Sequence, residues 1–554
     1  MKHVKLCAVC CCLLGFPLAG CKDSTHESPS SDVRHEITSR QYRDELLSYA
    51  IDNLNRLDQF ESGDVLSQIL QRLDPRQAKK RDSTDTLSAA WPEPEMLRQI
   101  VDRLNQWIRP QTAPTDWKPD PMVDALPKRL ADLPEVRRLD RLEFSRFDGF
   151  ALQETVWLRD VSRWARGESL NELEQAKSLF DWTVRNLQLD ADPPQRVPQF
   201  PWEVLLFGHG TAEERAWVFV ELARQQGLDA ALLEVGDAAS ADSKSSAASP
   251  QSTVPYLLVA VLIEGEAYLF DPTLGLPIPA LDGVTRDEDG RLTIQPATLA
   301  QAARGDKLLR QLDAPSRPYR VKAADFRKVA VLLDASPEQL SLRMKRLESR
   351  LTGSQKMALT VSPSAQSASW KSLAQVAEVR LWRRPFETLR RRSRLSDAEL
   401  TASLVSLLPF YALPSAPLHH GRVLHLKGVF TGEDGAIHYY QLARPSNEEL
   451  VASSVPDAEK FVYFRGKQDA GYWLGLVAFQ RGGYSTAADY FAIRTLRAAP
   501  NGPWTPGARY NLARTLEMLG DDQRAIVQYE ASGDLPGGLG GLIRAQWLAK
   551  PTGK

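Results

Sequence analysis

The sequence predicts a multidomain α+β protein, in which a helical N-terminal region precedes a mixed α+β core and an α-helical C-terminal region. Three observations support this prediction. The chain has 554 residues, which at roughly 150 residues per domain correspond to about three or four domains. Apolar residues recur at helical spacing in the first and last parts of the chain. Between them, a helix is followed by short apolar strands of the kind that form a buried sheet.

The composition indicates a folded, globular protein and excludes several classes of function. Hydrophobic residues make up 43% of the chain and charged residues 25%, which are ordinary values. The formal net charge of −1 argues against a protein dedicated to binding nucleic acid. All 5 cysteines lie within the first 21 residues. Disulfides, cysteine-ligated zinc and a cysteine nucleophile are therefore excluded from the rest of the chain.

The N-terminus has the order of an export signal. Two lysines precede an apolar stretch over 6–16, which is too short to span a bilayer. Ala19 and Gly20 then stand directly before Cys21, and this pattern resembles the lipobox of bacterial lipoproteins. The resemblance implies a signal peptide over 1–20, a lipid anchor on Cys21 and a bacterial envelope protein held at a membrane, periplasmic or at the cell surface. The alternative is ordinary secretion with an incidental cysteine.

Helical spacing predicts the elements that precede the core. Apolar residues indicate helices over 39–73, 95–108 and 170–187. The polar segment 22–34 is typical of a flexible tether, because it lacks the apolar residues that a packed element would bury.

The core begins with a clearly delimited helix. Thr211 is a suitable N-cap, Glu214 three residues later completes a capping box, and Gly227 ends the helix. Apolar strands are then predicted over 228–235 and 254–263. A Glu-Gly-Glu turn leads from the second strand into a return strand, so these two strands are expected to form a hairpin.

Two short motifs in this core resemble the transglutaminase-like, papain-related superfamily. One is a Gly-Thr-Ala motif that ends at Ala212, and the other is the hairpin from Tyr256 to Asp271. Members of the family carry a cysteine at the helix N-terminus, a histidine at the start of the hairpin and an aspartate at its end. The resemblance covers roughly residues 170–280 and implies a papain-like/transglutaminase-like α+β core. It places Ala212 at the nucleophile position, Tyr256 at the position of the base and Asp271 at that of the acid.

The catalytic chemistry of that family requires a thiol, which this part of the chain lacks. A cysteine at a helix N-terminus has a lowered pKa because of the helix dipole, and a histidine takes its proton. Ala212 cannot attack an acyl carbon, and Tyr256, with an ordinary pKa of ~10, is a poor base. The sequence therefore predicts a pseudoenzyme without catalytic residues. The alternative is a peptidase or acyl-transfer enzyme of the same fold that uses a non-cysteine nucleophile, Thr211 with His209.

The groove expected between the helix at Ala212 and the strand at Tyr256 is a candidate binding site. The hypothesis is that it binds a peptide or a glycan-linked peptide, with Thr211 at its edge and Trp202 and Trp217 as its walls. The simpler alternative is that both tryptophans belong to the hydrophobic core.

The C-terminal region contains two copies of one pattern. Small, apolar and aromatic residues recur 38 positions apart: Leu474, Gly475, Ala487 and Phe491, and then Leu512, Ala525 and Tyr529. Small residues let two helices pack closely, and the aromatic residue fills the next layer. The pattern resembles the tetratricopeptide repeat, and the alternative is an unrelated pair of helical hairpins. The resemblance implies other envelope proteins as partners.

Two further groups of residues are weaker candidates. A metal site at His419, His420 and His425 is not predicted, because no acidic residue accompanies them at ligand spacing. The arginine-rich run over 380–394 could meet anionic lipid head groups, but such a run is more simply a solvated helix face with scattered ion pairs. A β-hairpin is predicted over 421–430 and 436–442. No phosphate-binding loop or dinucleotide-binding motif is present, so the sequence predicts no cofactor.

These observations predict an order of segments and a function. The segments are a signal peptide (1–20), a polar tether with N-terminal helices (21–90), a helical lead-in (91–169), a catalytically degenerate transglutaminase-like domain (170–300), a mixed α/β connecting region (301–454) and tetratricopeptide-like helices (455–554). The predicted function is that of a membrane-anchored envelope lipoprotein that acts as a non-enzymatic binding or scaffold protein.

Overall fold

A computed structural model describes residues 31–60, 63–74, 76, 91–193, 196–236, 256–315, 317–412, 416–452 and 456–550. The predicted signal peptide and the proposed lipid attachment at Cys21 lie outside these residues. The chain forms two compact units, Met1–Glu45 and Leu46–Lys554, and their boundary falls within helix α1 (Ser31–Asp52). The sheet and all the site residues described below belong to the second unit.

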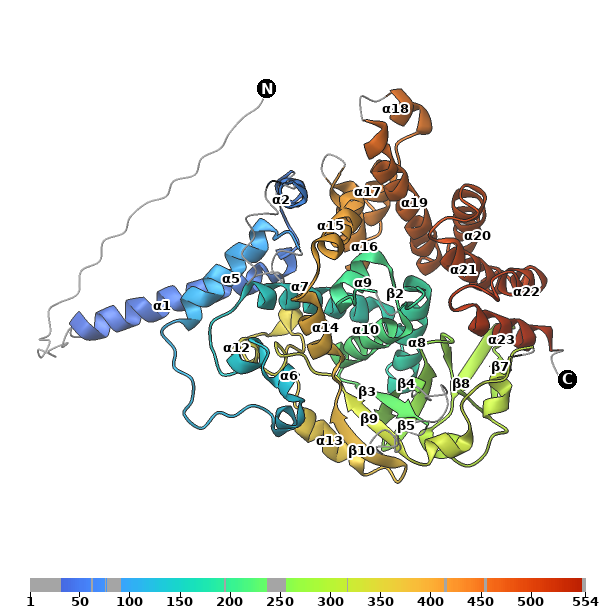
Figure 1. Cartoon of the computed structure of the whole chain (residues 1–554), viewed down its shortest axis with the longest axis horizontal. Helices are drawn as coiled ribbons and strands as arrows, with labels where there is room; N and C mark the ends of the chain where they lie inside the picture. Colours follow the sequence, from blue (N-terminus) through green and yellow to red (C-terminus); the bar gives the residue numbers. More distant parts are fainter. Residues whose placement is uncertain are drawn as a thin grey trace, which may run out of the picture. The chain divides into compact units, whose positions relative to one another are not determined.

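A six-stranded mixed sheet lies at the centre of the second unit, with strand order β10-β9-β3-β4-β5-β6 (Figure 1). Its strands are β3 (Asp229–Val235), β4 (Tyr256–Ile263), β5 (Glu266–Asp271), β6 (Leu276–Pro277), β9 (Val329–Leu333) and β10 (Val376–Leu381). β3, β4 and β5 run antiparallel, with Leu232 opposite Val259 and Val259 opposite Phe270. The strand and hairpin predicted in this part of the chain are therefore confirmed, and the parallel pair β9–β10 extends the sheet beyond them.

Alternate residues of the sheet face two separate hydrophobic cores. On β3, Leu232 packs in one core and Leu233 in the other, as the two-residue repeat of a strand requires. Helices α8 (Glu172–Asn186) and α10 (Ala212–Gln225) cover the first face. The short helix α11 (Leu299–Ala302) and helix α13 (Pro363–Lys371) lie against the second face. Both faces of the sheet are thus buried, which explains its nearly continuous apolar strands.

Helix α10 begins and ends where the sequence predicts. Thr211 is its N-cap and forms the capping box with Glu214, so this prediction is confirmed. Gly227, just beyond its C-terminus, has a φ of +76°, a left-handed conformation that glycine adopts without strain.

Helices and short turns dominate the chain before α10. They are η1 (Leu54–Arg56), α2 (Asp64–Leu73), α5 (Glu95–Ile108), η2 (Pro121–Ala125), α6 (Lys128–Ala131), η3 (Val136–Arg138), α7 (Arg146–Ala165) and α9 (Pro201–Phe207), with a two-stranded parallel ladder of β1 (Gln188–Leu189) and β2 (His209–Gly210). The helical pattern predicted over 39–73 is interrupted, because α1 ends at Asp52 and α2 begins at Asp64. α5 packs closely on α7 at Gly149, where an added Cβ would lie 2.6 Å from Leu97 Cδ2.

Several short elements connect the strands of the sheet or follow its last strand. The connecting elements are β7 (Pro279–Arg286), β8 (Leu292–Pro296), η5 (Leu309–Leu312), η6 (Ala323–Phe326), α12 (Leu342–Glu348) and η7 (Gly353–Gln355), and the element that follows is α14 (Arg384–Arg392). β7 and β8 form a separate antiparallel pair. α14 contains the centre of the arginine-rich run and follows directly on β10.

The chain after α14 is helical. Its elements are α15 (Asp397–Tyr411), α16 (Pro417–Leu426), α17 (Ala436–Leu442), α18 (Asn447–Ala452), α19 (Asp457–Gln480), α20 (Tyr484–Asp489), the π-helical segment η8 (Tyr490–Arg497), α21 (Thr505–Met518), α22 (Asp522–Glu530) and α23 (Gly538–Ala549). The β-hairpin predicted over 421–430 and 436–442 is wrong, because these segments lie largely in α16 and α17. Nearly every side chain of α16 is buried, so its sequence lacks the polar face that reveals a helix.

The described chain is a mixed α/β fold with a helical C-terminal region. Among the helices that the structure describes, none combines the length and the apolar character needed to cross a membrane.

Candidate functional site

The N-terminus of α10 corresponds to the position at which the family that the sequence resembles carries its catalytic cysteine. Ala212 is the first residue of this helix and is partly exposed. Thr211, the residue before it, is only 1% exposed. Its hydroxyl accepts a hydrogen bond from the backbone N–H of Glu214 at 3.2 Å, and its own N–H donates to Glu214 Oε2 at 2.9 Å. The residues here thus cap the helix, and the side chain at 212 is a methyl group.

The other two predicted positions lie together at the end of the hairpin. Tyr256 Oη donates to Asp271 Oδ2 at 2.7 Å. A second tyrosine, Tyr319, donates to the same oxygen at 2.8 Å. The backbone N–H groups of Thr273 and Leu274 donate to Asp271 Oδ1 at 2.8 and 2.9 Å. Asp271 is fully buried, and its carboxylate is held by two tyrosines and two backbone groups.

Burial shifts the pKa of each side chain in this cluster upward. Desolvation raises the pKa of Asp271, although its four hydrogen bonds oppose that effect. Desolvation and the adjacent carboxylate raise the pKa values of Tyr256 and Tyr319, so both hydroxyls keep their protons at neutral pH. The guanidinium of Arg320 lies over the Tyr256 ring at 4.6 Å from its centroid.

Helix α10 is connected to the end of the hairpin through Arg215 rather than through Ala212. Arg215 lies one turn into the helix, and its Nη1 donates to the carbonyl oxygen of Pro272 at 3.2 Å. In the described part of the chain, no hydrogen bond joins Thr211 to Tyr256 or Asp271. The structure therefore brings the predicted base and acid positions together and leaves the threonine in a separate set of contacts.

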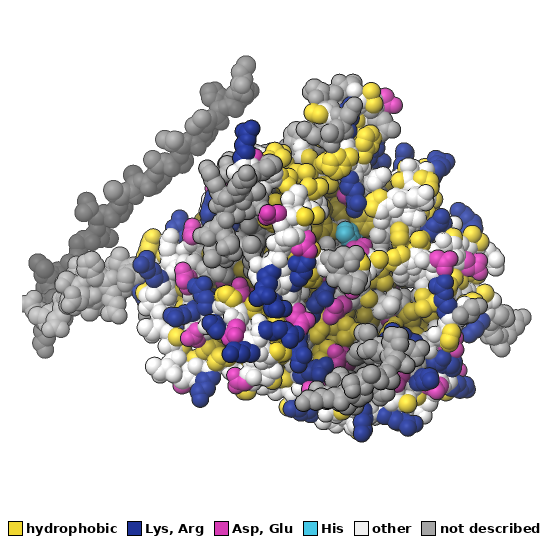
Figure 2. Space-filling model, in the orientation of Figure 1, with side chains coloured by type: hydrophobic (Ala, Val, Ile, Leu, Met, Phe, Trp, Pro, Cys, Tyr) yellow, Lys and Arg dark blue, Asp and Glu magenta, His cyan; other side chains and the backbone are white. Residues whose placement is uncertain are grey.

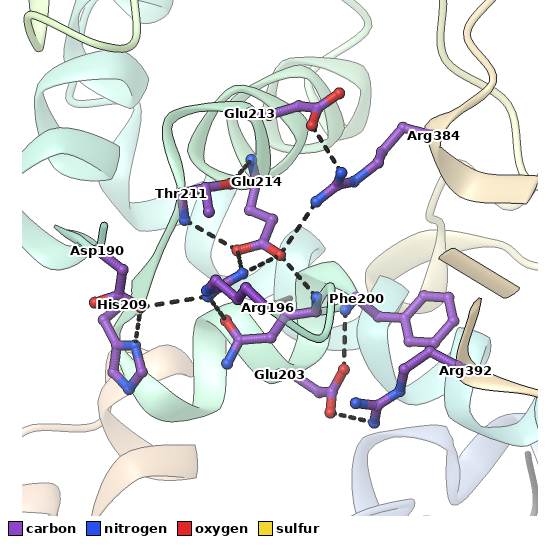
Figure 3. A network of polar contacts seen from close by, with 11 residues as sticks. Asp190, Arg196, Phe200, Glu203, His209, Thr211, Glu213, Glu214, Arg384 and Arg392 are labelled. Atoms are coloured by element: carbon purple, nitrogen blue, oxygen red, sulfur yellow. Dashed lines mark hydrogen bonds and ion pairs between the residues drawn. The ribbon is translucent and has the colours of Figure 1, made fainter. Parts of the chain in front are cut away.

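A network of charged side chains surrounds the start of α10 (Figure 3). Glu214 has a fully buried side chain, and its oxygens accept from Arg196 Nη1 at 2.7 and 2.8 Å. Arg196 Nη2 reaches Asp190 at 3.3 Å, and Asp190 Oδ2 lies 2.6 Å from His209 Nδ1. Although burial raises it, the pKa of Asp190 is held below its ordinary value by the hydrogen bond to His209 and the charge of Arg196.

The arginine-rich run supplies the other side of this network. Arg384 Nη1 pairs with Glu213 at 2.8 Å, and Arg392 Nη2 pairs with the buried Glu203 at 2.7 Å (Figure 3). Arg392 is itself only 2% exposed and lies over the Trp91 ring at 4.3 Å. Arg392 is therefore not part of a solvated helix face, because Glu203 of α9 holds it against the core. The Arg384 side chain stays 20% exposed in its pair with Glu213 of α10.

The two tryptophans expected near a groove are packed in the core. Trp202 is 5% exposed, stacks on Phe150 and meets the edge of Trp91 at a centroid distance of 5.0 Å. Trp217 is 3% exposed and contacts Trp382. Their burial agrees with the simpler of the two interpretations given above.

The three histidines of α16 form no metal site. His419 and His425 are buried, and burial lowers the pKa of His419 to about 3. His425 Nδ1 lies 3.2 Å from Tyr440 Oη. Within the described ranges, no group of three or more histidine, cysteine, aspartate and glutamate side chains could hold a metal ion.

The residues of the C-terminal pattern are buried between helices. Leu474, Ala487, Phe491, Leu512, Ala525 and Tyr529 are all at most 5% exposed. A Cβ added at Gly475 would lie 2.6 Å from the Phe491 ring. The helices that carry these residues also contact the approach to α10. Gln188 Oε1 accepts from Gly507 N at 2.8 Å, and the rings of His209 and Trp504 lie 6.0 Å apart.

Sequence reasoning missed several residues of this site. Tyr319 and Trp504 come from segments far along the chain, and no motif links them to the core. Arg384 belongs to the arginine-rich run named above, but the sequence does not show its ion pair with Glu213. For Glu214 the sequence showed only the capping role, because the contact with Arg196 depends on a loop whose path the sequence does not specify.

Comparison with known families identifies the core. Residues 159–249 match the family model described as the transglutaminase-like superfamily. The chain therefore carries a transglutaminase-like domain, which begins in α7 and includes α8, α10 and β3. Neither the comparison with curated proteins nor the comparison with solved structures found a match.

Proposed function

We propose that this protein is a membrane-anchored bacterial envelope lipoprotein that acts as a non-enzymatic scaffold. Its transglutaminase-like domain is degenerate and papain-like in its core, and its C-terminal helices are tetratricopeptide-like. The single observation that carries the proposal is the pairing of Ala212 at the nucleophile position with a Tyr256–Asp271 hydrogen bond at the positions of the base and acid.

The chemistry of these positions supports the absence of acyl transfer. A general base must accept a proton, but the Tyr256 hydroxyl keeps its proton and donates a hydrogen bond to Asp271. The carboxylate is also shared with Tyr319, so it already has its full set of donors. This cluster stabilises the end of the hairpin, and it offers no group that could activate a nucleophile at Ala212.

The C-terminal helices supply the proposed contact surface. Phe461 and Phe464 of α19 lie one helical turn apart and are 54% and 41% exposed. Leu442 and Val451, from the two preceding helices, are 54% and 74% exposed. Figure 2 shows hydrophobic side chains gathered around α19. Exposed apolar side chains that are grouped in this way are typical of a surface that binds another protein.

The experiment that tests the scaffold role is crosslinking followed by affinity purification from membranes. The Phe461→Ser/Phe464→Ser double variant is compared with the wild type and with Leu170→Ser, which alters a leucine that is 90% exposed elsewhere. We expect specific partners to be lost only from the double variant. Equal recovery of every crosslinked protein from all three would contradict the proposal.

The lipid anchor is tested separately. The wild type is expected to incorporate labelled fatty acid and to fractionate with membranes. Cys21→Ser should remain unlabelled and leave the membrane fraction, because a single thioether-linked attachment site is removed. Labelling of Cys21→Ser at the wild-type level would exclude Cys21 as the attachment site.

The second candidate function is a peptidase or acyl-transfer enzyme with Thr211 as nucleophile. The observation that favours it is the 2.6 Å contact between His209 and Asp190, which resembles a base with its orienting acid. Purified protein is assayed on peptide and isopeptide substrates, together with Thr211→Val and Thr298→Val. Thr298 is a matched control, because it caps α11 with the same type of capping box. Turnover that disappears only in Thr211→Val would favour the enzyme, whereas the scaffold proposal expects no turnover in any form.

A further inference from the structure

A small cavity lies where α8 and α10 of the transglutaminase-like domain meet the C-terminal helices α19 and α21. Its volume is about 30 Å³, which is room for roughly two water-sized groups. Its lining includes Arg185, Arg215, Tyr472, Tyr510 and Asn511. Helix α21 packs beside α8, so the cavity is lined by segments far apart in the sequence.

Arg215 is a buried cation that no carboxylate balances directly. It is 5% exposed, and its two terminal nitrogens donate to the backbone carbonyls of Pro272 and Leu187. Its Nε has no hydrogen-bond partner, and no ion pair involves Arg215 among the residues that the structure describes. Burial lowers the pKa of Arg215 to about 10, so the side chain is still charged at neutral pH. A buried full charge that meets only backbone dipoles is costly unless an anion approaches it.

The carboxylates nearest to Arg215 are occupied by other partners. Asp190 is bonded to His209 and Arg196, and Asp271 to its two tyrosines. Both influence Arg215 through space without touching it.

Arg185 is a second source of positive charge on the same cavity. Its Nε donates to Asp181 at 2.7 Å, but its Nη1 has no partner in the described structure. Asp181 is shared with Arg514, also at 2.7 Å. Asp181 is thus shared by two arginines, and Glu517 pairs with Arg544.

Asn511 adds an acceptor. Its Nδ2 donates to the carbonyl oxygens of Arg185 and Gly507 and to Tyr472 Oη, each at 3.0 Å. Backbone carbonyls can only accept, which fixes the orientation of this amide. Its Oδ1 is then the atom without a partner. Two unpartnered guanidinium donors and one unpartnered amide acceptor thus belong to residues that line one cavity.

We propose that this cavity binds a carboxylate group. Guanidinium groups recognise the two oxygens of a carboxylate with strong, charge-assisted hydrogen bonds. The volume suits the two oxygens of a carboxylate, and Asn511 Oδ1 accepts a hydrogen bond from an N–H or O–H of the same ligand. The carboxylate belongs either to a small free acid or to the C-terminus of a peptide. This site goes beyond the scaffold role and does not depend on it.

The test is a titration of the purified mature protein with sodium acetate, with sodium chloride at equal ionic strength as the reference. The melting temperature is expected to rise by at least about 2 °C when acetate exceeds its dissociation constant 100-fold. Arg215→Met and Arg185→Met should each weaken acetate binding at least about tenfold. Arg422→Met is the matched control, because Arg422 is also fully buried and donates to a backbone carbonyl, that of Leu205, but does not line this cavity. It should bind acetate like the wild type.

Two results would overturn the site. One is an acetate effect in the wild type no larger than that of chloride, and the other is wild-type acetate affinity in both cavity variants. If Arg215→Met does not fold, Arg185→Met alone decides, because its Asp181 partner retains Arg514. A second experiment compares the binding of trialanine, its C-terminal amide and acetate. Tighter binding of trialanine than of both acetate and the amide identifies a peptide terminus as the source of the carboxylate. Equal binding of trialanine and acetate identifies a small acid. Failure of this test leaves the partner-capture experiment on α19 unaffected.

Discussion

Tyr256 donates a 2.7 Å hydrogen bond to Asp271 across the hairpin that joins β4 to β5. The pair occupies the positions at which the sequence resemblance places a relative's histidine and aspartate. A phenol in place of an imidazole keeps the carboxylate bonded while removing the proton acceptor. The hairpin thus has a stabilising hydrogen bond between Tyr256 and Asp271 at the positions where the resemblance implies a catalytic histidine and aspartate.

The first prediction concerns the separation of these positions. In Ala212→Cys, the helix dipole stabilises a thiolate at the helix N-terminus. Tyr256 packs with Tyr319 in the second core, on the face of the sheet away from α10. We therefore expect Ala212→Cys and Ala212→Cys/Tyr256→His to be alkylated with the same pH midpoint, because an imidazole at position 256 would not reach the thiol. Alkylation rates measured from pH 5 to 10 test this expectation after Cys21 has been replaced by Ser in both forms. A midpoint at least about one unit lower in the double variant would contradict it.

The second prediction concerns the close approach of Gly475 and Phe491. An added Cβ would lie 2.6 Å from a ring that is fully buried, so neither side can move away freely. Gly475→Ala should lower the free energy of unfolding by about 1–3 kcal/mol. Gly471→Ala in the same helix is the control, because its Cβ would meet nothing closer than 3.9 Å. Urea denaturation measures both, and the control should be neutral or slightly stabilising.

The third prediction concerns the buried ion pair of Glu203 and Arg392. These side chains are 3% and 2% exposed, so Glu203→Gln leaves a guanidinium charge buried and unpaired. The expected loss is about 3–5 kcal/mol of unfolding free energy. Asp132→Asn removes an exposed pair with Arg137 at a similar distance of 2.8 Å and should cost less than about 1 kcal/mol. Chemical denaturation that gave equal losses for the two variants would contradict this assignment.

The fourth prediction is a pH dependence that arises from Glu338. Burial, together with the charge of Asp148, raises the pKa of this carboxyl from 4.5 to about 8, although Arg343 opposes the shift. The folded protein therefore holds a proton that the unfolded chain releases between these pH values. Unfolding free energy should fall as the pH rises from 4.5 to 8, by about 5 kcal/mol in total. The difference in unfolding free energy between the wild type and Glu338→Gln, measured across this range, isolates the contribution and should become independent of pH below pH 4.

The core was predictable because its signals are local. The capping box of Thr211 and Glu214 and the apolar strands 228–235 and 254–263 each depend on residues close together in the sequence, and the structure confirms them. Local patterns failed where burial is complete. α16 is apolar or buried on all sides, so its periodicity is hidden and a β-hairpin was predicted instead.

The surroundings of the site could not be predicted, because they depend on contacts between distant segments. Tyr319 reaches Asp271 from 48 residues away, and Arg392 reaches Glu203 from 189 residues away. A run of arginines in a sequence looks the same whether it faces water or the carboxylates of another helix. Only the packing of α14 against the core distinguishes the two cases.

The contact of Gln188 with the backbone of Gly507 and Pro503 has a mechanical consequence. It joins the C-terminal helices to strand β1, and the partner of β1, strand β2, leads directly into α10. A partner bound to α19 would therefore be held at a fixed position relative to the sheet. The orientation of the bound partner would be set by the fold rather than by a flexible linker.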